Sequence, residues 1–332
     1  MSRYCSGSFV YPDPFKEEAA FIACLKQKVL ELSPKMLLPT HDESVVIMRH
    51  RGEFPQELII PYENAELLLR LADKSASTEM ARKAGVPVPH VYRSAEEVKA
   101  YPVVFKTVMG NSAKSVFFPK SPLELAALME QYKDERTLLE QWVGGTDYSV
   151  DVVRWEGFFK ASTYRAVVTK TAGGGTTTQR EIVSMPQLER YAEMLLDAVD
   201  YQGVCGLDFR YDSTSGRCAY IETNARFTGG IATPITAGFD IPWVLYKLAT
   251  EGRYDAPIHV KAGTRTKWIL GDIITLVGRV LSMRWNFREM RQVFSFSGFD
   301  AFDDYYADDR KAIIGELSYY FAKLVKNRKL NP

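Results

Sequence analysis

The segment 206–226 constrains the fold of this chain more than any other, because its polar and apolar residues alternate with the period of two that a β-strand requires. Its central stretch is rich in turn formers and ends in Gly216, which suits a hairpin with a three-residue loop whose glycine comes last. The apolar face of the predicted hairpin consists of Leu207, Phe209, Ile221 and Thr223. On the other face, such a loop places Asp208 directly opposite Glu222.

Two carboxylates that face each other across a strand pair repel, and a divalent cation between them would remove that penalty. Asn224 lies one step further along the same face as Glu222. Two carboxylates and an amide suit Mg²⁺, which normally takes its remaining ligands from waters and phosphates. If the strand persists, Arg226 continues this face and is placed to meet an anion. The alternative is that Asp208 and Glu222 are solvated side chains of an ordinary hairpin.

The run 206–210 together with residues 221–230 resembles the metal-binding hairpin of ATP-grasp enzymes. The resemblance implies that Asp208, Glu222 and Asn224 hold Mg²⁺ on the phosphates of ATP, with Mn²⁺ as an alternative ion. It extends over roughly the first 250 residues, and the other parts of the family pattern occur upstream in the family's order.

Lys106 ends an apolar strand and precedes a loop of small residues, an arrangement that brings an ammonium and backbone N–H groups against phosphate oxygens. It resembles the family lysine at the end of a Pro-Val-Val-x-Lys strand, and the loop that follows resembles the flexible loop over the β- and γ-phosphates. In that loop, Ser112 and Lys114 are the implied phosphate contacts. Lys74 resembles an earlier family lysine that also contacts ATP. For Lys114 and Lys74, a solvated surface position is the alternative.

The segment 138–151 resembles the strand that joins the two halves of the ATP-grasp fold. The resemblance implies that Glu140 accepts from the adenine amino group, that the backbone from Gln141 to Val143 bonds the base edge, and that Asp147 binds the ribose hydroxyls. The alternatives are a strand-edge role for Glu140 and a turn role for Asp147.

Less regular segments border the place where related ligases bind their substrates. The candidate substrate residues there are Arg165, Gly174, Arg180 and Gly230, and either arginine could pair with an anionic group. The alternative is that these segments are flexible surface loops.

We expect an α/β (α+β) chain with the ATP-grasp fold, in which two α+β subdomains clamp ATP. Short buried elements at 35–39 and 45–48, after a helix over 15–32, suggest an α/β unit at the front. Residues 268–281 suggest an amphipathic helix that packs on the body or forms a partner surface. The predicted parts are a partial N-terminal α/β domain (1–73), an ATP-grasp domain (74–250, divided into 74–138 and 139–250) and a helical C-terminal region (251–332).

The charge balance, the cysteine spacing and the apolar runs of the sequence limit the kinds of partner and the cellular location that we expect. The 332 residues include 42 lysines and arginines against 41 aspartates and glutamates, a formal net charge of +1, which disfavours nucleic acid as a partner. The four cysteines show no zinc-ligand spacing, so we expect free thiols in a reducing compartment. The N-terminus has no signal-peptide pattern, and no apolar run is long enough for a bilayer span. These features favour a cytoplasmic protein with small-molecule partners, and a homodimer is left open.

The resemblance implies a ligase in which a carboxylate attacks the γ-phosphate to give an acylphosphate and ADP, and an amine then displaces phosphate. Arg226 and Lys106 are the implied catalytic residues, because they would offset charge on the phosphoryl group. The alternatives are an ATP-grasp phosphotransferase, which leaves phosphate on its product, and a nucleotide-binding protein without catalysis.

Overall fold

The computed structural model describes residues 2–109, 115–171, 174–281 and 287–327. The N-terminal part is helical, since amphipathic segments there bury one face each. Its helices are α1 (Glu18–Leu32), α2 (Glu43–Arg49) and α3 (Ala65–Ala72). The α/β alternation expected here is reduced to one isolated parallel bridge between Met36 and Ile59, and residues 45–48 lie in α2. The short element expected over 45–48 is buried, as predicted, but Val46 and Ile47 lie on one face of a helix.

A small antiparallel sheet follows the helix α4 (Lys74–Lys83), and its strand order is β1-β4-β2-β3. The helix α5 (Pro122–Gln131) packs on one side of this sheet and buries Leu125 against it. The strands are β1 (Val91–Tyr92), β2 (Val103–Thr107), β3 (Val116–Phe117) and β4 (Thr137–Gln141).

A seven-stranded sheet forms the centre of the molecule, with the order β11-β10-β7-β6-β5-β8-β9. Its apolar face is covered by α6 (Pro186–Ala198) and α8 (Ile241–Glu251), so that the alternating apolar residues of β5 and β8 form the main core. The strands are β5 (Thr146–Trp155), β6 (Phe158–Thr171), β7 (Gly174–Val183), β8 (Gly203–Asp212), β9 (Arg217–Asn224), β10 (Arg265–Lys267) and β11 (Ala301–Phe302).

The C-terminal region departs from the purely helical region that we expected over 251–332. Its strands β10 and β11 extend the large sheet beyond β7, and α9 packs beside β6 and β7. The amphipathic helix expected over 268–281 is confirmed as α9. The C-terminal helices are α9 (Ile269–Leu281), α10 (Phe287–Val293) and α11 (Lys311–Asn327), and the short helix α7 (Ala232–Thr236) precedes α8.

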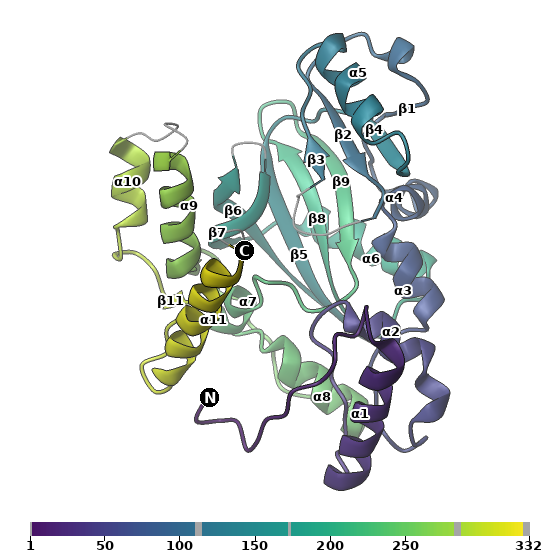
Figure 1. Cartoon of the computed structure of the whole chain (residues 1–332), viewed down its shortest axis with the longest axis vertical. Coiled ribbons are helices and arrows are strands. Elements are labelled where there is room, and N and C mark those ends of the chain that lie inside the picture. The colour runs from purple at the N-terminus through teal and green to yellow at the C-terminus, as the bar shows by residue number, and fades with distance from the viewer. Residues whose placement is uncertain (1, 110–114, 172–173, 282–286, 328–332) are drawn as a thin grey trace.

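Figure 1 shows the arrangement of these parts around the large sheet. The small sheet and α5 lie at one end, the N-terminal helices lie at the other end, and α9, α10 and α11 flank the β7 side. The fold is therefore mixed α+β, with two sheets that face each other across the region where the sequence placed the nucleotide.

Candidate functional site

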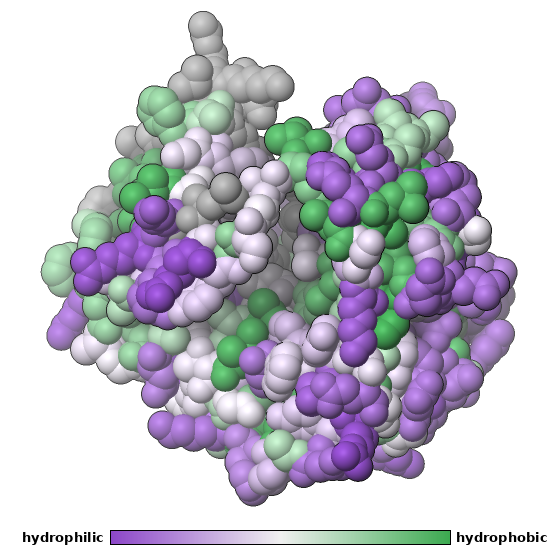
Figure 2. All heavy atoms as spheres, turned by 90° about the horizontal axis from the view of Figure 1, so that it is seen from below, coloured by the Kyte–Doolittle hydropathy of each residue, from purple (hydrophilic) through white to green (hydrophobic). Residues whose placement is uncertain are grey.

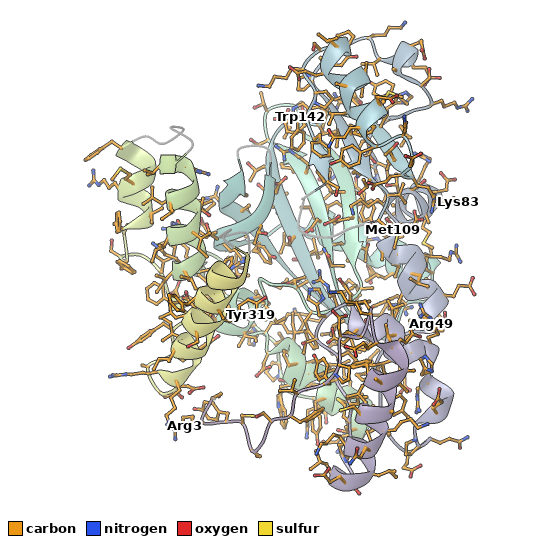
Figure 3. The ribbon with its side chains drawn as sticks, in the orientation of Figure 1. Arg3, Arg49, Lys83, Met109, Trp142 and Tyr319 are labelled. Atoms are coloured by element: carbon orange, nitrogen blue, oxygen red, sulfur yellow. The ribbon has the colours of Figure 1, made fainter. Side chains whose placement is uncertain are left out.

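A cavity of about 1170 Å³ lies between the small and the large sheet. Side chains of β2 and β4 line one wall, and those of β5, β6, β8 and β9 line the other. Trp142, labelled in Figure 3, lies where the two sheets meet, with its ring 5.1 Å from that of Phe118 and 4.4 Å from the guanidinium carbon of Arg210. The space-filling view from below shows a surface that is hollowed near its centre (Figure 2).

A row of polar side chains crosses the cavity face of the large sheet. Directly paired residues share a face, and the register pairs Glu222 with Asp208, Asp208 with Ser149, and Ser149 with Tyr164. Ser149 Oγ donates to one oxygen of Asp208, and Asn224 Nδ2 donates to the other at 3.2 Å. The predicted opposition of Asp208 and Glu222 is confirmed, and Asn224 joins the same cluster.

The pairing of Asp208 with Glu222 is as predicted, but the loop of the hairpin differs from the predicted one. Asp212 pairs with Arg217, so the loop has four residues, with Gly216 last at φ +68°. A β-bulge between Asp208 and Phe209 takes up the extra residue, Ile221 on β9, and restores the pairing at the site. The three-residue loop was wrong because a bulge that compensates for loop length has no local sequence signal.

The facing carboxylates carry an electrostatic penalty in the protein alone. Burial, and next the charge of Glu222, raise the pKa of Asp208 to about 7. A divalent cation would favour the ionised form of both groups. The described residues include no group of three or more His, Cys, Asp or Glu side chains at metal-binding distance. A cation here would therefore bind two carboxylates, an amide and oxygen atoms from outside the protein, which is the donor set that suits Mg²⁺.

Cationic side chains line the same cavity as the carboxylates. Lys106 Nζ lies 2.8 Å from Glu140 Oε2, and both residues are buried in the cavity wall. Lys74, at the start of α4, places its Nζ 3.8 Å from Glu222 Oε2. Arg226 Nε donates to Asp42 Oδ1 at 2.8 Å, so an N-terminal residue holds the arginine that follows the hairpin of β8 and β9.

The end of the cavity lined by β4 contains a buried acceptor. The second oxygen of Glu140, Oε1, has no hydrogen-bond partner among the described residues. Such an atom fits the amino group of a base, because an unsatisfied buried acceptor costs free energy until a donor reaches it. Gln141 and Val143 line the same end, but the N–H of Gln141 already donates to His90 O at 2.8 Å. A base would therefore use other backbone groups of the segment.

Asp147 lies in the cavity wall beside a cation. Arg210 Nη1 donates to Asp147 Oδ1 at 2.8 Å. Burial raises the pKa of Asp147, and the charge and hydrogen bond of Arg210 oppose that rise. The carboxylate thus keeps one oxygen directed to a fixed partner.

The remaining predicted residues are divided between the cavity and the surface. Arg180 and Gly230 line the cavity. Arg165 instead pairs with Glu181 at 2.9 Å on the surface, since alternation turns it away from the face that carries Tyr164. Gly174 begins β7. Ser112 and Lys114 lie outside the described residues.

Several residues of the site were not predicted. Ser149 and Tyr164 complete the polar row. The alternation of Asp147, Ser149 and Asp151 along β5 is the signal that could have identified Ser149. Asp42, and Asp303 beside Arg180, are separated from their partners by 184 and 123 residues, and no local pattern links them.

Comparison with known proteins gives matches over the same region. A family model described as ATP-grasp in the biosynthetic pathway with Ter operon matches residues 133–271. A D-alanine–D-alanine ligase of Fusobacterium nucleatum subsp. nucleatum is 24% identical over 163 residues, which cover 46% of this chain and 55% of the ligase. The chain thus covers little more than half the length of this curated relative.

Solved structures share the fold at low sequence identity. Biotin carboxylase from Campylobacter jejuni, in a β-γ-ATP complex, superposes with a TM-score of 0.62 at 17% identity and covers 76% of this chain and 63% of its own. The biotin carboxylase domain dimer of Hydrogenobacter thermophilus 2-oxoglutarate carboxylase, with MgADP, ADP and bicarbonate, gives 0.61 at 15% identity and covers 73% and 60%. At these identities the likeness is one of fold. Among the described helices, none combines the length and apolar character that a bilayer crossing requires.

Proposed function

We propose that this chain, which matches an ATP-grasp family model over residues 133–271 and shares the fold of a biotin carboxylase, is an ATP- and Mg²⁺-dependent ligase that joins a carboxylate to an amine. One observation carries the proposal. Facing carboxylates at Asp208 and Glu222 lie on one wall of a large cavity, and the buried pair of Lys106 and Glu140 lies on the other. This arrangement has room for a nucleotide between a cation site and an unsatisfied acceptor.

The protein binds and orients the nucleotide in this proposal. Glu140 Oε1 accepts from the adenine amino group, the backbone near Gln141 and Val143 borders the base, and Asp147 binds the ribose. Lys74 and Lys106 offset phosphate charge, with Ser112 and Lys114 of the loop as further contacts. Asp208, Glu222 and Asn224 hold Mg²⁺, with Mn²⁺ as the alternative. Bound ATP supplies the phosphoryl group and the cation neutralises its oxygens.

The reaction then needs little covalent chemistry from the protein. A substrate carboxylate oxygen attacks the γ-phosphorus, the bond to ADP breaks, and an acylphosphate forms. The amine attacks the acyl carbon, the bond to phosphate breaks, and the amine loses a proton. Arg226, oriented by Asp42, and Lys106 stabilise the negative charge that develops on the phosphoryl oxygens.

The substrate wall is proposed to include Arg180 and Gly230, which line the cavity beyond the metal hairpin. Arg165, which the sequence also suggested, pairs with Glu181 on the surface, so a role for it would need a substrate that extends beyond the cavity. Gly174, at the start of β7, stays a proposed substrate residue. A homodimer remains a proposal for the assembly, and a related fold is a dimer in its solved structure.

Release of phosphate from ATP tests the proposal. If the protein is a ligase, free phosphate should be released only when a carboxylate and an amine are both present. Phosphate retained on the product would indicate a phosphotransferase. Glu222→Gln should abolish Mg²⁺-dependent turnover and leave the far-ultraviolet circular dichroism spectrum unchanged. Glu181→Gln, outside the cavity lining, is the matched control and should keep full turnover. Full turnover in Glu222→Gln would overturn the metal assignment.

A further inference from the structure

Arg180 on β7 is a buried cation with unused hydrogen-bonding capacity. It is 3% exposed, yet it lines the cavity. A guanidinium has five N–H donors. Nη1 donates to Asp303, Nη2 donates to Thr177 O at 2.6 Å, and Nε has no partner among the described residues. Since an unmet buried donor is costly, an acceptor supplied from outside the protein would be stabilised at this guanidinium.

Gly230 brings the chain close to this guanidinium. A Cβ at position 230 would lie 2.9 Å from Arg180 Nε and 2.5 Å from Tyr164 Oη, closer than real Cβ atoms come. Only glycine therefore allows the backbone to approach both groups. Tyr164, Arg180 and Gly230 all belong to the cavity lining. Together they form one polar corner of the cavity, at the β7 end of the polar row.

The acceptor that orients Arg180, Asp303, belongs to the C-terminal region. Residue Phe302 of β11 pairs with Lys267 of β10, and the N–H of Asp303 donates to Lys267 O at 2.9 Å. The next residue, Asp304, accepts from the N–H of Leu270 at 2.8 Å at the start of α9. The backbone on both sides of the Asp303 side chain is thus fixed, and its carboxylate is 12% exposed.

We propose that Arg180 binds a carboxylate of a substrate in this corner and that Asp303 is the positioning residue that sets its orientation. The inference rests on the ligase function proposed above and names a substrate class for it. Asp303 accepts from Nη1 of the guanidinium, and this contact keeps Nε directed to the corner beside Gly230. A guanidinium suits a carboxylate because the planar fork matches two oxygens. The C-terminal region is then part of the substrate site.

The register indicates how far this corner lies from the cation site. Three strand spacings separate β8, which carries Asp208, from β7, which carries Arg180, and neighbouring strands are about 4.8 Å apart. The two backbones are therefore roughly 14 Å apart, and long side chains reduce the gap between functional groups. The carboxylate at Arg180 is either the reacting carboxylate or a second one on the same or the other substrate, and the probes below distinguish these sources.

Binding of small carboxylates in the presence of MgADP tests the proposal without turnover. The probes are glutarate, its monoamide glutaramate, butyrate and butyramide. The readout is the Arg180 Nε–H resonance in protein labelled with ¹⁵N at arginine, identified as the peak that Arg180→Lys lacks. We expect glutarate to shift this peak and butyramide to leave it unchanged. An equal shift with butyrate and glutaramate assigns the corner to the reacting carboxylate, and a shift that needs glutarate assigns it to a second carboxylate.

Variants of Asp303 test the positioning role. Asp303→Asn should weaken the binding of the effective probe about tenfold or more, and Asp303→Glu should restore part of it. Asp308→Asn makes the same change at an exposed position of the same region and should bind as the unsubstituted protein does. No shift with any carboxylate, or undiminished binding in Asp303→Asn, would overturn the proposal. Because no turnover is measured, that result is separate from failure of the Glu222→Gln test of the ligase.

Discussion

Two lysine–carboxylate pairs of the described residues are withdrawn from solvent, and their surroundings differ. Lys106 and Glu140 join β2 to β4 at 2.8 Å, whereas Lys267 and Asp272 join β10 to α9 at 3.3 Å. Lys267 also donates to Val293 O and, at 2.9 Å, to Ser295 O. The pair in the C-terminal region thus has its lysine satisfied by the protein, while the other pair lines the cavity.

A carboxylate oxygen without a hydrogen-bond partner occurs in both pairs, so it does not by itself distinguish them. Glu140 and Asp272 each keep one oxygen without a hydrogen-bond partner among the described residues. Only the Glu140 oxygen belongs to a residue of the cavity wall, and Asp272 lies in the first turn of α9, where Gln179 Nε2 donates to it at 2.6 Å. The comparison teaches that access, more than burial or pairing, distinguishes a buried charge that holds the fold from one that can meet a ligand.

Lys267→Met should give the largest effect, because it leaves Asp272 charged, buried and without its cation. Removal of one partner from a buried pair costs about 3–5 kcal/mol, and the backbone carbonyls of Val293 and Ser295 would lose their donor as well. The measurement is the free energy of unfolding in urea. Lys261→Met, at a lysine whose side chain is 75% exposed, is the control. A loss below about 1 kcal/mol would show that Asp272 does not depend on the lysine.

Lys106→Met should affect ligand binding more than folding. A hydrogen bond to a charged group contributes about 1.5–3 kcal/mol, so the affinity for a non-hydrolysable ATP analogue should fall roughly 10- to 100-fold. The cost in stability should be smaller than for Lys267→Met, because Glu140 lines the cavity and Asp272 does not. Calorimetric titration and urea unfolding check the two parts, with the exposed Lys133→Met as the control. Equal losses of stability in the two lysine variants would contradict the role of access.

Asp151 extends the comparison to a buried carboxylate without a lysine. It is 2% exposed, and burial raises its pKa to about 7. Because the folded state holds the proton more tightly than the unfolded state, stability is greatest at low pH and falls as pH rises towards 7. Asp151→Asn should remove up to about 1.4 kcal/mol per pH unit of this dependence. Unfolding in urea between about pH 5 and 7 measures the slope, and an unchanged slope would show that Asp151 does not titrate there.

The parts of the site that the sequence predicted are those with a local signal. The alternation around Asp208 and Glu222 placed them opposite each other, even though the loop was one residue longer than expected. Lys106 and Glu140 were each singled out, but their pairing depends on the register of β2 against β4, which no short motif carries. The hydrogen bond from Arg180 to Asp303 joins residues that are 123 positions apart. It forms because β10 and β11 extend the large sheet. The local periodicity over 251–332 did not indicate these strands.

The exposed pair of Arg165 and Glu181 should contribute least to the free energy of unfolding among the pairs compared. Its atoms are 2.9 Å apart, but the two side chains are 46% and 24% exposed. Since water screens such a pair, Arg165→Gln should change the free energy of unfolding by less than about 1 kcal/mol. The affinity for the ATP analogue should stay unchanged, because the pair lies outside the cavity lining. A fall in affinity comparable to that of Lys106→Met would instead place Arg165 in contact with a ligand, as the sequence suggested, and would break the link between access and function.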